Sequence, residues 1–383
     1  MLDEFCRNTG YNRKYAIRLL NGPPPARAPR PRRGRRRSPT YGPALISVLA
    51  AIWEAAGYPW SVRLKALLPL WMPWIRPRFA LRPEVERQLL RISARSIDYR
   101  LRTQKRRLKK RLYGRTKPGT LLKHHIPIKT DNWDVRTPGF TEIDLVSHSG
   151  NSAAGDYCHS LNLTDIHTTW VETRAVLGKG QEGVRQALEQ MRPALPFALR
   201  GIDSDNGSEF INDHLWRYCQ ALSVQFTRGR PYKKDDNAHI EQKNWTHVRK
   251  LLGYARYDSR VALEAINHLY TQELRLFQNL FLPCVKLARK VRIGSRLKRV
   301  YGAPQTPFER VCASPQASPA QVAQLQKLRD TLDPFQLSQI IHTKLDRIFQ
   351  LASSTRALAP ENAHDSQPST AMHRKKKEAK KKD

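Results

Sequence analysis

Cysteines are few in this sequence, and their spacing supports no covalent framework. The five cysteines are odd in number and far apart, and no two form a CxxC pair. This argues against a disulfide scaffold and a four-ligand zinc site, and it favours a reducing, intracellular setting. Long apolar runs are also missing, because the most apolar stretch, 44–75, is interrupted by Glu54, Arg63, Lys65 and several prolines. We therefore expect buried helices there, no membrane span and no membrane partner.

Acidic residues are scarce beside basic ones. The chain has 33 Asp and Glu against 68 Lys and Arg, a net charge of +35. Such an excess of like charge contributes nothing to folding, and nucleic acid is the commonest partner that compensates for it. A soluble basic enzyme without such a partner is the alternative. At roughly 150 residues per domain, the length suggests two or three domains, and the sequence shows no internal repeat.

Residues 1–22 have the pattern of a partial helix-turn-helix unit. Gly10 supplies a turn, and Asn12 is placed to cap a second helix. That helix carries three basic residues that we predict to contact DNA: Arg13, Lys14 and Arg18. Any short helical hairpin can give the same pattern. The first helix of a complete unit would also precede Met1, so we expect the sequence to start inside such a unit.

Residues 23–40 form a linker rich in proline and arginine, which should stay extended because it has no apolar surface to bury. It is either a solvated tether or an arm that lies along phosphates or in a minor groove. We favour DNA contact, because so many guanidinium groups otherwise repel one another. The arginines predicted to make this contact are Arg32, Arg33, Arg35, Arg36 and Arg37.

A helical DNA-binding region is predicted for 41–112, with a second helix-turn-helix in which Ser93 caps the helix 94–101. A linker, 113–138, follows it. The composition then changes to strands rich in β-branched and aromatic residues, which alternate later with helices. We predict strands at 140–146, 157–163, 169–176, 199–203 and 224–227, and helices at 182–195, 211–222 and 238–252. This order predicts an α/β fold for 139–256, with a mixed sheet covered by helices.

A helical and basic region is expected at 257–355, followed by a disordered, lysine-rich tail at 356–383. The first of these contains a helix at 261–277 and a basic extended stretch at 285–301. A pair of helices completes it at 318–351.

Three acidic residues stand where strands and a helix of the predicted core can bring them together. Asp144 lies in the first strand, Asp205 ends the fourth, and Glu241 lies near the start of the long helix. Clustered carboxylates repel one another unless cations balance them. Ligands that are all oxygen suit Mg²⁺ or Mn²⁺, and two such ions about 4 Å apart promote in-line phosphodiester displacement. Glu142 and Asp203 each lie two residues from a proposed ligand, so spacing alone leaves them as alternatives.

Several motifs carry a family resemblance. Asp-Asn-Gly-Ser-Glu-Phe at 205–210 is similar to the segment around the second aspartate of the DDE transposase and retroviral-integrase superfamily. Arg-Pro-Tyr at 230–232 and Asn-Ala-His-Ile-Glu at 237–241 resemble the loop and helix that bear its glutamate. The two acids are 36 positions apart (241 − 205), a spacing typical of integrases. The resemblance covers about 139–254 and implies a ribonuclease H-like catalytic core.

This resemblance implies an enzyme that cleaves DNA strands and transfers them at the ends of a mobile element. Asp144, Asp205 and Glu241 would be its catalytic residues and the ligands of two Mg²⁺ or Mn²⁺ ions. Its partners would be double-stranded DNA and further copies of the chain, because two ends must be held together. The segments 133–140 and 230–234 resemble bacterial insertion-sequence transposases, which implies a cytoplasmic, nucleoid-associated protein.

Residues near the three acids have predicted roles of their own. Lys233 and Lys234, beside Tyr232, are placed to hold substrate phosphates, although a solvated loop is the alternative. Asn244 lies three residues after Glu241 on the same helical face, where it touches DNA or a ligand water, or is a plain surface residue. The spacing turns Trp245 and Val248 toward the core. Surface positions are expected for Glu172, Glu182 and Glu209.

Two other functions are compatible with parts of the sequence. One is a nuclease of the same fold that cuts but does not join, which the residues do not distinguish from a transposase. The other is a catalytically silent DNA-binding regulator, for which the helix-turn-helix units and the tail suffice. The complete set of three acids argues against the regulator, because clustered carboxylates repel DNA unless cations bridge them.

Overall fold

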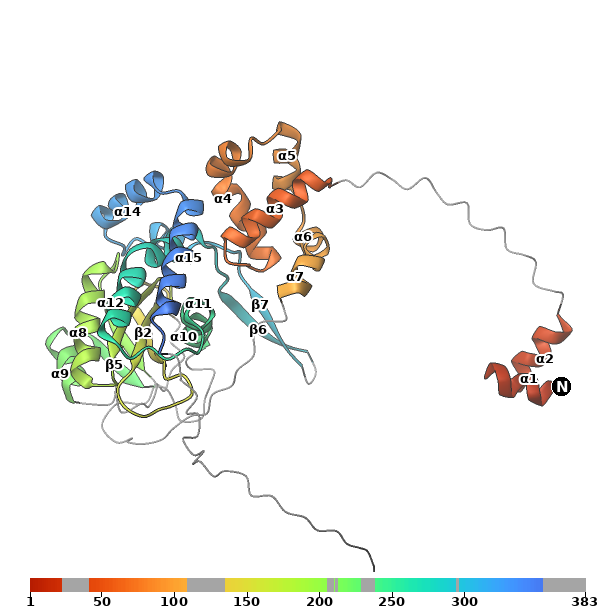
Figure 1. Cartoon of the computed structure of the whole chain (residues 1–383), viewed down its shortest axis with the longest axis horizontal. Coiled ribbons are helices and arrows are strands. Elements are labelled where there is room, and N and C mark those ends of the chain that lie inside the picture. Colours follow the sequence, from red (N-terminus) through yellow and green to blue (C-terminus); the bar gives the residue numbers. More distant parts are fainter. Residues whose placement is uncertain are drawn as a thin grey trace, which may run out of the picture. The chain divides into compact units, whose positions relative to one another are not determined.

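The computed structural model describes 1–22, 41–108, 135–204, 210, 213–228, 238–293 and 296–353 (Figure 1). The chain forms two compact units, 1–46 and 47–383. No helix in these described ranges is long and apolar enough to cross a membrane. The predicted linkers 23–40 and 113–138 lie outside the described residues for all or most of their length, as does the tail 356–383.

A helical hairpin begins the first unit. It consists of α1 (Leu2–Thr9) and α2 (Arg13–Asn21), with Gly10 between them at a φ of 70°. The Asn12 side chain accepts a hydrogen bond from the backbone N–H of Lys14 at 3.0 Å, which confirms the predicted turn and cap. Most of α2 is exposed, including three of its basic residues and several large apolar ones. The basic residues are Arg13, Lys14 and Arg18.

Helices fill the region before the sheet, as the sequence predicts. Ser93 caps the fourth of them by accepting a hydrogen bond from the N–H of Ser96 at 3.1 Å, which confirms the second predicted cap. Many of their apolar side chains, including Trp53 and Trp71, are buried. The five helices are α3 (Pro43–Ala55), α4 (Ser61–Phe79), α5 (Pro83–Arg91), α6 (Ala94–Arg100) and α7 (Arg102–Leu108).

A five-stranded mixed sheet forms the centre of the second unit. Its strands have the order β3-β2-β1-β4-β5; β1, β2 and β3 pair antiparallel, while β4 and β5 run parallel to β1. This is the ribonuclease H-like arrangement, so the predicted fold class is confirmed. The strands are β1 (Phe140–Ser147), β2 (Cys158–Asp165), β3 (Val171–Leu177), β4 (Gly201–Ser204) and β5 (Gln225–Arg228).

Helices cover this sheet (Figure 1). Between β3 and β5, α8 packs against β3 and α9 against β5. After β5, the predicted long helix packs on β1 and β2 and contains a π-helical segment in its middle. The bounds are α8 (Gln181–Met191), α9 (Asp213–Ala221), α10 (Ala238–Lys243), the π-helical segment (Asn244–Arg249) and α11 (Lys250–Leu252).

The open edge of β3 is closed by two asparagine side chains. Asn267 both accepts from the N–H and donates to the C=O of Ala175, at 2.8 and 2.9 Å. Asn279 makes the same pair of bonds with Val171, at 3.0 and 2.8 Å. Each amide thus replaces one residue of a neighbouring strand. Both asparagines belong to the helical run that starts with α12 (Arg260–Leu269) and continues through π-helical turns to Phe281.

The remaining elements follow this helical run. The basic stretch predicted to be extended forms an antiparallel hairpin of β6 (Leu287–Ile293) and β7 (Arg296–Tyr301). In Figure 1 this hairpin reaches away from the sheet. Three helices end the described chain: α13 (Pro307–Cys312), α14 (Pro319–Thr331) and α15 (Pro334–Gln350).

Helix α4 is bonded to the segments that follow the sheet. Arg63 Nε donates to the Pro283 carbonyl at 2.5 Å, and Trp71 Nε1 donates to the Phe281 carbonyl at 3.1 Å. The Trp71 ring also packs edge-on against Phe335 of α15, with 5.1 Å between ring centroids. The helical region and the sheet region therefore share one core.

The expected surface position of Glu172 is wrong. This residue of β3 is fully buried. Its Oε1 accepts from Arg275 Nε at 2.6 Å and from Trp170 Nε1 at 2.9 Å, and its Oε2 lies 3.4 Å from Arg174 Nη1. A buried carboxylate is stable only with such partners. Two of them lie close to Glu172 in sequence, but Arg275 is 103 positions away. Glu182 is exposed as predicted, and Glu209 lies outside the described residues.

Candidate active site

Asp144 lies on β1, on the face of the sheet that the long helix covers. Its side chain is half-buried, unlike the fully buried residues before it on the strand. Oδ2 of Asp144 accepts a hydrogen bond from Asn244 Nδ2 at 2.6 Å, and Oδ1 accepts from the N–H of Leu145 at 2.8 Å. These two donors fix the orientation of the carboxylate while leaving it reachable.

Asn244 links two strands to the long helix. While its amide nitrogen donates to Asp144, its Oδ1 accepts from Asn162 Nδ2 at 2.9 Å. Asn162 lies on β2 directly opposite Asp144 in the strand register. The Oδ1 of Asn162 is buried, and no donor among the described residues reaches it. The site thus holds an oxygen with unused capacity next to the Asp144 carboxylate.

Glu142 and Asp203, the two alternatives that spacing left open, have other partners. Both are fully buried and lie opposite each other in the register of β1 and β4. Glu142 Oε2 accepts from the N–H of Ile240 at 2.9 Å, at the start of α10. Asp203 Oδ1 accepts from Thr227 Oγ1 at 2.6 Å. Glu142 therefore anchors the helix N-terminus, and Asp203 joins β4 to β5.

The other two predicted acids are only partly placed. Asp205 lies outside the described residues, but it directly follows Ser204, which ends β4 opposite Ile143. Glu241 belongs to α10, between the residue bonded to Glu142 and the residue bonded to Asp144, and its side chain is outside the described set. In the part of the chain that is described, no three His, Cys, Asp or Glu residues lie together as a metal site.

The predicted DNA contacts near the site also fall beyond the described ranges. Tyr232, Lys233 and Lys234 lie outside them, and so do the arm arginines, which are Arg32, Arg33, Arg35, Arg36 and Arg37. Asn244 is described and half-buried, and it binds the candidate carboxylate directly. It is therefore more than the plain surface residue that spacing allowed.

The π-helical segment changes which residues of the long helix face inward. Val248 is fully buried, as predicted, but Trp245 is 44% exposed, so its expected core position is wrong. A π-helix pairs each residue with the one five positions away, which adds about one residue per turn and rotates the side chains that follow. His247 is turned inward as a result and is buried. Such segments often occur at functional sites.

Asn162 is a part of this site that sequence reasoning missed. The only available signal was its alternation with Leu161 and Leu163, which places Asn162 and Thr164 on the same face of β2.

One curated relative covers most of the chain. The uncharacterized protein y4rM of Sinorhizobium fredii (strain NBRC 101917 / NGR234) is 38% identical over 316 residues, which are 81% of this chain and 88% of that protein. The chain belongs to the y4rM family. No family model matches the sequence. The shared length includes more than the sheet, so the y4rM family has the flanking regions in common as well.

Two solved structures are similar to part of this y4rM-family chain. The catalytic core domain of BIV integrase is 16% identical, covers 45% of this chain and 91% of its own, and has a TM-score of 0.30. The HTLV-2 integrase catalytic core domain in complex with magnesium is 14% identical, with 39% and 91% covered and a TM-score of 0.29. The fold is defined by the strand order and pairing.

Proposed function

We propose that this chain is a transposase or integrase that cleaves DNA strands and transfers them at the ends of a mobile element. The observation that supports this best is the orientation of the Asp144 carboxylate. It is held by Asn244, a residue of the helix that also carries Glu241, on a ribonuclease H-like sheet. Asp205 directly follows β4, the strand beside β1, which supports a position for it near Asp144.

The donor set fits hard divalent cations. We infer that Asp144, Asp205 and Glu241 hold two Mg²⁺ or Mn²⁺ ions, because all three offer carboxylate oxygens, and Asn162 Oδ1 adds a buried oxygen without a donor. When bound, two such ions polarise the attacking and leaving oxygens of a phosphodiester displacement. The chain's own residues supply the geometry. Asn244 fixes the Asp144 carboxylate, and Glu142 holds the start of the helix that carries Glu241.

Double-stranded DNA is the proposed substrate, bound by basic groups from several segments of the chain. The hairpin β6–β7 supports this, because segment 285–301 contains no acidic residue and four of its basic side chains are exposed. A two-stranded ribbon of this kind fits the major groove. The four are Arg289, Arg292, Lys298 and Arg299. Helix α2, the arm 23–40 and the pair Lys233 and Lys234 are proposed to add contacts, and several copies of the chain to assemble on the DNA.

A strand-transfer assay with Mg²⁺ and a labelled element end tests the proposal. Both cleaved and joined products are expected. Cleavage without joining would instead show a nuclease. DNA binding with no product, unchanged by Asp205→Asn, would show a regulator.

Removing the Asn244 side chain is expected to slow strand transfer about tenfold while DNA affinity stays within about twofold. Asn244→Ala removes the hydrogen bond from Asn244 to Asp144 Oδ2, which holds the carboxylate less firmly, and small misplacements at an active site are costly. Single-turnover rates measure the effect. Gln242→Ala is the matched control, because Gln242 is an exposed amide on the same helix. Equal rates for the two variants would show that Asn244 does not position the catalytic carboxylate.

Neutralising the hairpin is expected to flatten the salt dependence of DNA binding. Arg289→Gln with Lys298→Gln removes two charges from one face of the ribbon, because Lys298 pairs with Val291, two residues from Arg289. The slope of log K against log salt should fall by about 1.8. Lys327→Gln with Arg347→Gln removes the same charge from exposed positions on α14 and α15. An equal fall of the slope in this control would show that any loss of positive charge weakens binding and that the hairpin has no specific role.

A further inference from the structure

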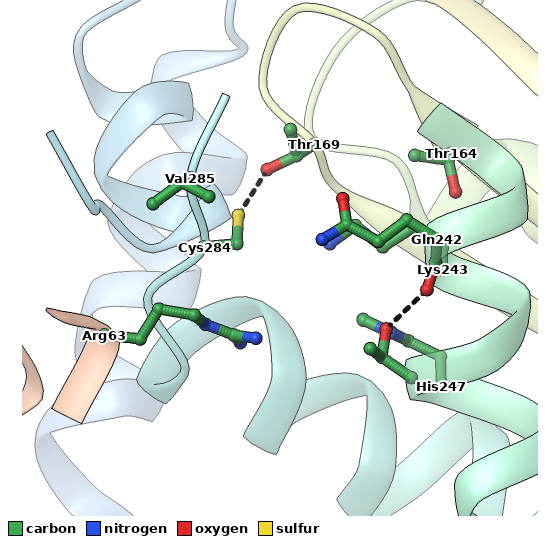
Figure 2. A pocket seen from close by; sticks show the side chains of 9 residues that line it. Arg63, Thr164, Thr169, Gln242, Lys243, His247, Cys284 and Val285 are labelled. Carbon is green, nitrogen blue, oxygen red and sulfur yellow. Dashed lines mark hydrogen bonds between the residues drawn. The ribbon is translucent and has the colours of Figure 1, made fainter. Parts of the chain in front are cut away.

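A small cavity lies where four distant parts of the chain meet (Figure 2). It has a volume of about 20 Å³, enough for one water-sized group. Its lining comes from α4, the turn between β2 and β3, the long helix and the segment before β6. Four of the residues that line it are Arg63, Thr169, Lys243 and Cys284.

Cationic side chains from three helices lie around this cavity. Arg63 of α4 and Lys243 of α10 point into it (Figure 2). Arg310 of α13 does not line the cavity but contacts the sulfur of Cys284. Lys243 is only 7% exposed, and none of the described residues accepts a hydrogen bond from its ammonium group. None of the lining residues is acidic, so the Cys284 thiol is the one lining group that can carry a negative charge.

The contacts of the sulfur favour its thiolate form. Arg310 Nη1 lies 3.0 Å from Cys284 Sγ, and Thr169 Oγ1 lies 2.9 Å from it, as the dashed line in Figure 2 shows. Arg310 Nη2 also donates to the Cys284 carbonyl at 2.6 Å, which fixes the guanidinium. Burial alone would raise the pKa of Cys284, but Lys243, Arg310 and the two hydrogen bonds outweigh it and lower the pKa to about 7.

Burial lowers the pKa of Lys243, whereas the negative charge of Cys284 raises it. Arg63 is a further cation beside the sulfur. Burial holds the pKa of His247 well below its usual value, so that imidazole is neutral and adds no charge.

We propose that Cys284 is an oxidation site that takes hydroperoxides. The thiolate attacks one peroxide oxygen, the S–O bond forms as the O–O bond breaks, and the product is a sulfenic acid. The sulfur loses two electrons to the peroxide, and the leaving hydroxide or alkoxide takes a proton from water. The cavity has room for the added oxygen, because it accepts one group of that size. Arg63 and Lys243 point into the same space and can donate hydrogen bonds to this oxygen.

The other cysteines provide an internal comparison. Burial raises the pKa of Cys158 to about 11 and that of Cys219 to about 12. Cys312 is exposed, yet burial of its sulfur also raises its pKa. Exposure alone therefore predicts that Cys312 reacts before Cys284, whereas thiolate content predicts the reverse.

Peptide mass spectrometry on the full chain decides between these two orders. The protein is treated with hydrogen peroxide at pH 7 in the presence of a cyclic 1,3-dione, which traps sulfenic acids. Cys284 is expected to be labelled at least about tenfold faster than Cys312. Labelling of Cys312 or Cys6 as fast as Cys284 would overturn the proposal.

Two lysine variants distinguish the effect of the positive charge in the cavity from a general effect on the fold. Lys243→Met should slow labelling of Cys284 about tenfold, because one cation beside the sulfur is lost. Lys250→Met removes a lysine of the same helix that bonds the Gly57 carbonyl instead, and it should leave the rate unchanged. Equal rates in both variants count against the proposal. If Lys243→Met does not fold, the order of Cys284 and Cys312 in the unaltered chain still decides.

Discussion

Asp144→Asn, Asp205→Asn and Glu241→Gln are each expected to reduce Mg²⁺-dependent strand transfer at least about a hundredfold. Each change removes one carboxylate from the proposed metal site and keeps the size of the side chain. A divalent ion contributes several kcal/mol to a phosphodiester displacement, so the loss of one ligand is costly even when the fold is intact. DNA affinity should stay the same or rise slightly, because a negative charge near the phosphates is removed.

Glu182→Gln is the matched control for this series. Glu182 is an exposed carboxylate at the start of α8, paired with Arg185, and it lies away from β1 and α10. Its replacement should leave strand transfer within about twofold. Full activity of Glu241→Gln would show that the site has been assigned to the wrong residues. Full activity of Asp144→Asn together with an inactive Glu142→Gln would move the first ligand to Glu142.

Glu172→Gln is expected to lower the free energy of unfolding by about 3–5 kcal/mol. Glu172 is completely buried between Arg275 and Arg174, and it also accepts from Trp170 Nε1. Glutamine fills the same space but leaves two guanidinium groups without a counter-charge in the core. Removing one partner of a buried pair costs far more than the pair itself contributes.

Urea unfolding followed by tryptophan fluorescence measures this change. Glu182→Gln breaks a surface ion pair with Arg185 and should cost less than about 1 kcal/mol. A loss for Glu172→Gln no larger than that of the control would show that the buried charges contribute little to stability. Glu172 is in register with Leu163 and Ile143, so its side chain lies on the opposite face of the sheet from Asp144, and DNA affinity of the folded protein is expected to be unchanged.

The order of the sheet and its helices could be predicted from the sequence, because periodicity and breakers act locally. All five predicted strands and the three helices of the core are present, with ends shifted by a few residues. The caps of Asn12 and Ser93 were predictable for the same reason, since each bonds a neighbour in sequence. The pairing of β6 with β7 was not, because the alternation there is interrupted by charges on both faces.

The details of the site depend on contacts that sequence spacing does not contain. Asn244 meets Asn162 across 82 positions, and Glu172 meets Arg275 across 103. A charged residue flanked by apolar ones has the same local pattern whether it faces water or a buried arginine. The π-helical turn after Lys243 also has no local signature, so the outward position of Trp245 could not be foreseen.

The two asparagines that close the edge of β3 limit how copies of this chain can associate. An open edge strand offers its N–H and C=O groups to any other strand and so invites sheets to merge between molecules. Here Asn267 and Asn279 already occupy the groups of Ala175 and Val171. A second copy therefore cannot extend the sheet at these positions. Any assembly through the β3 side therefore has to use helices and loops in place of a shared sheet.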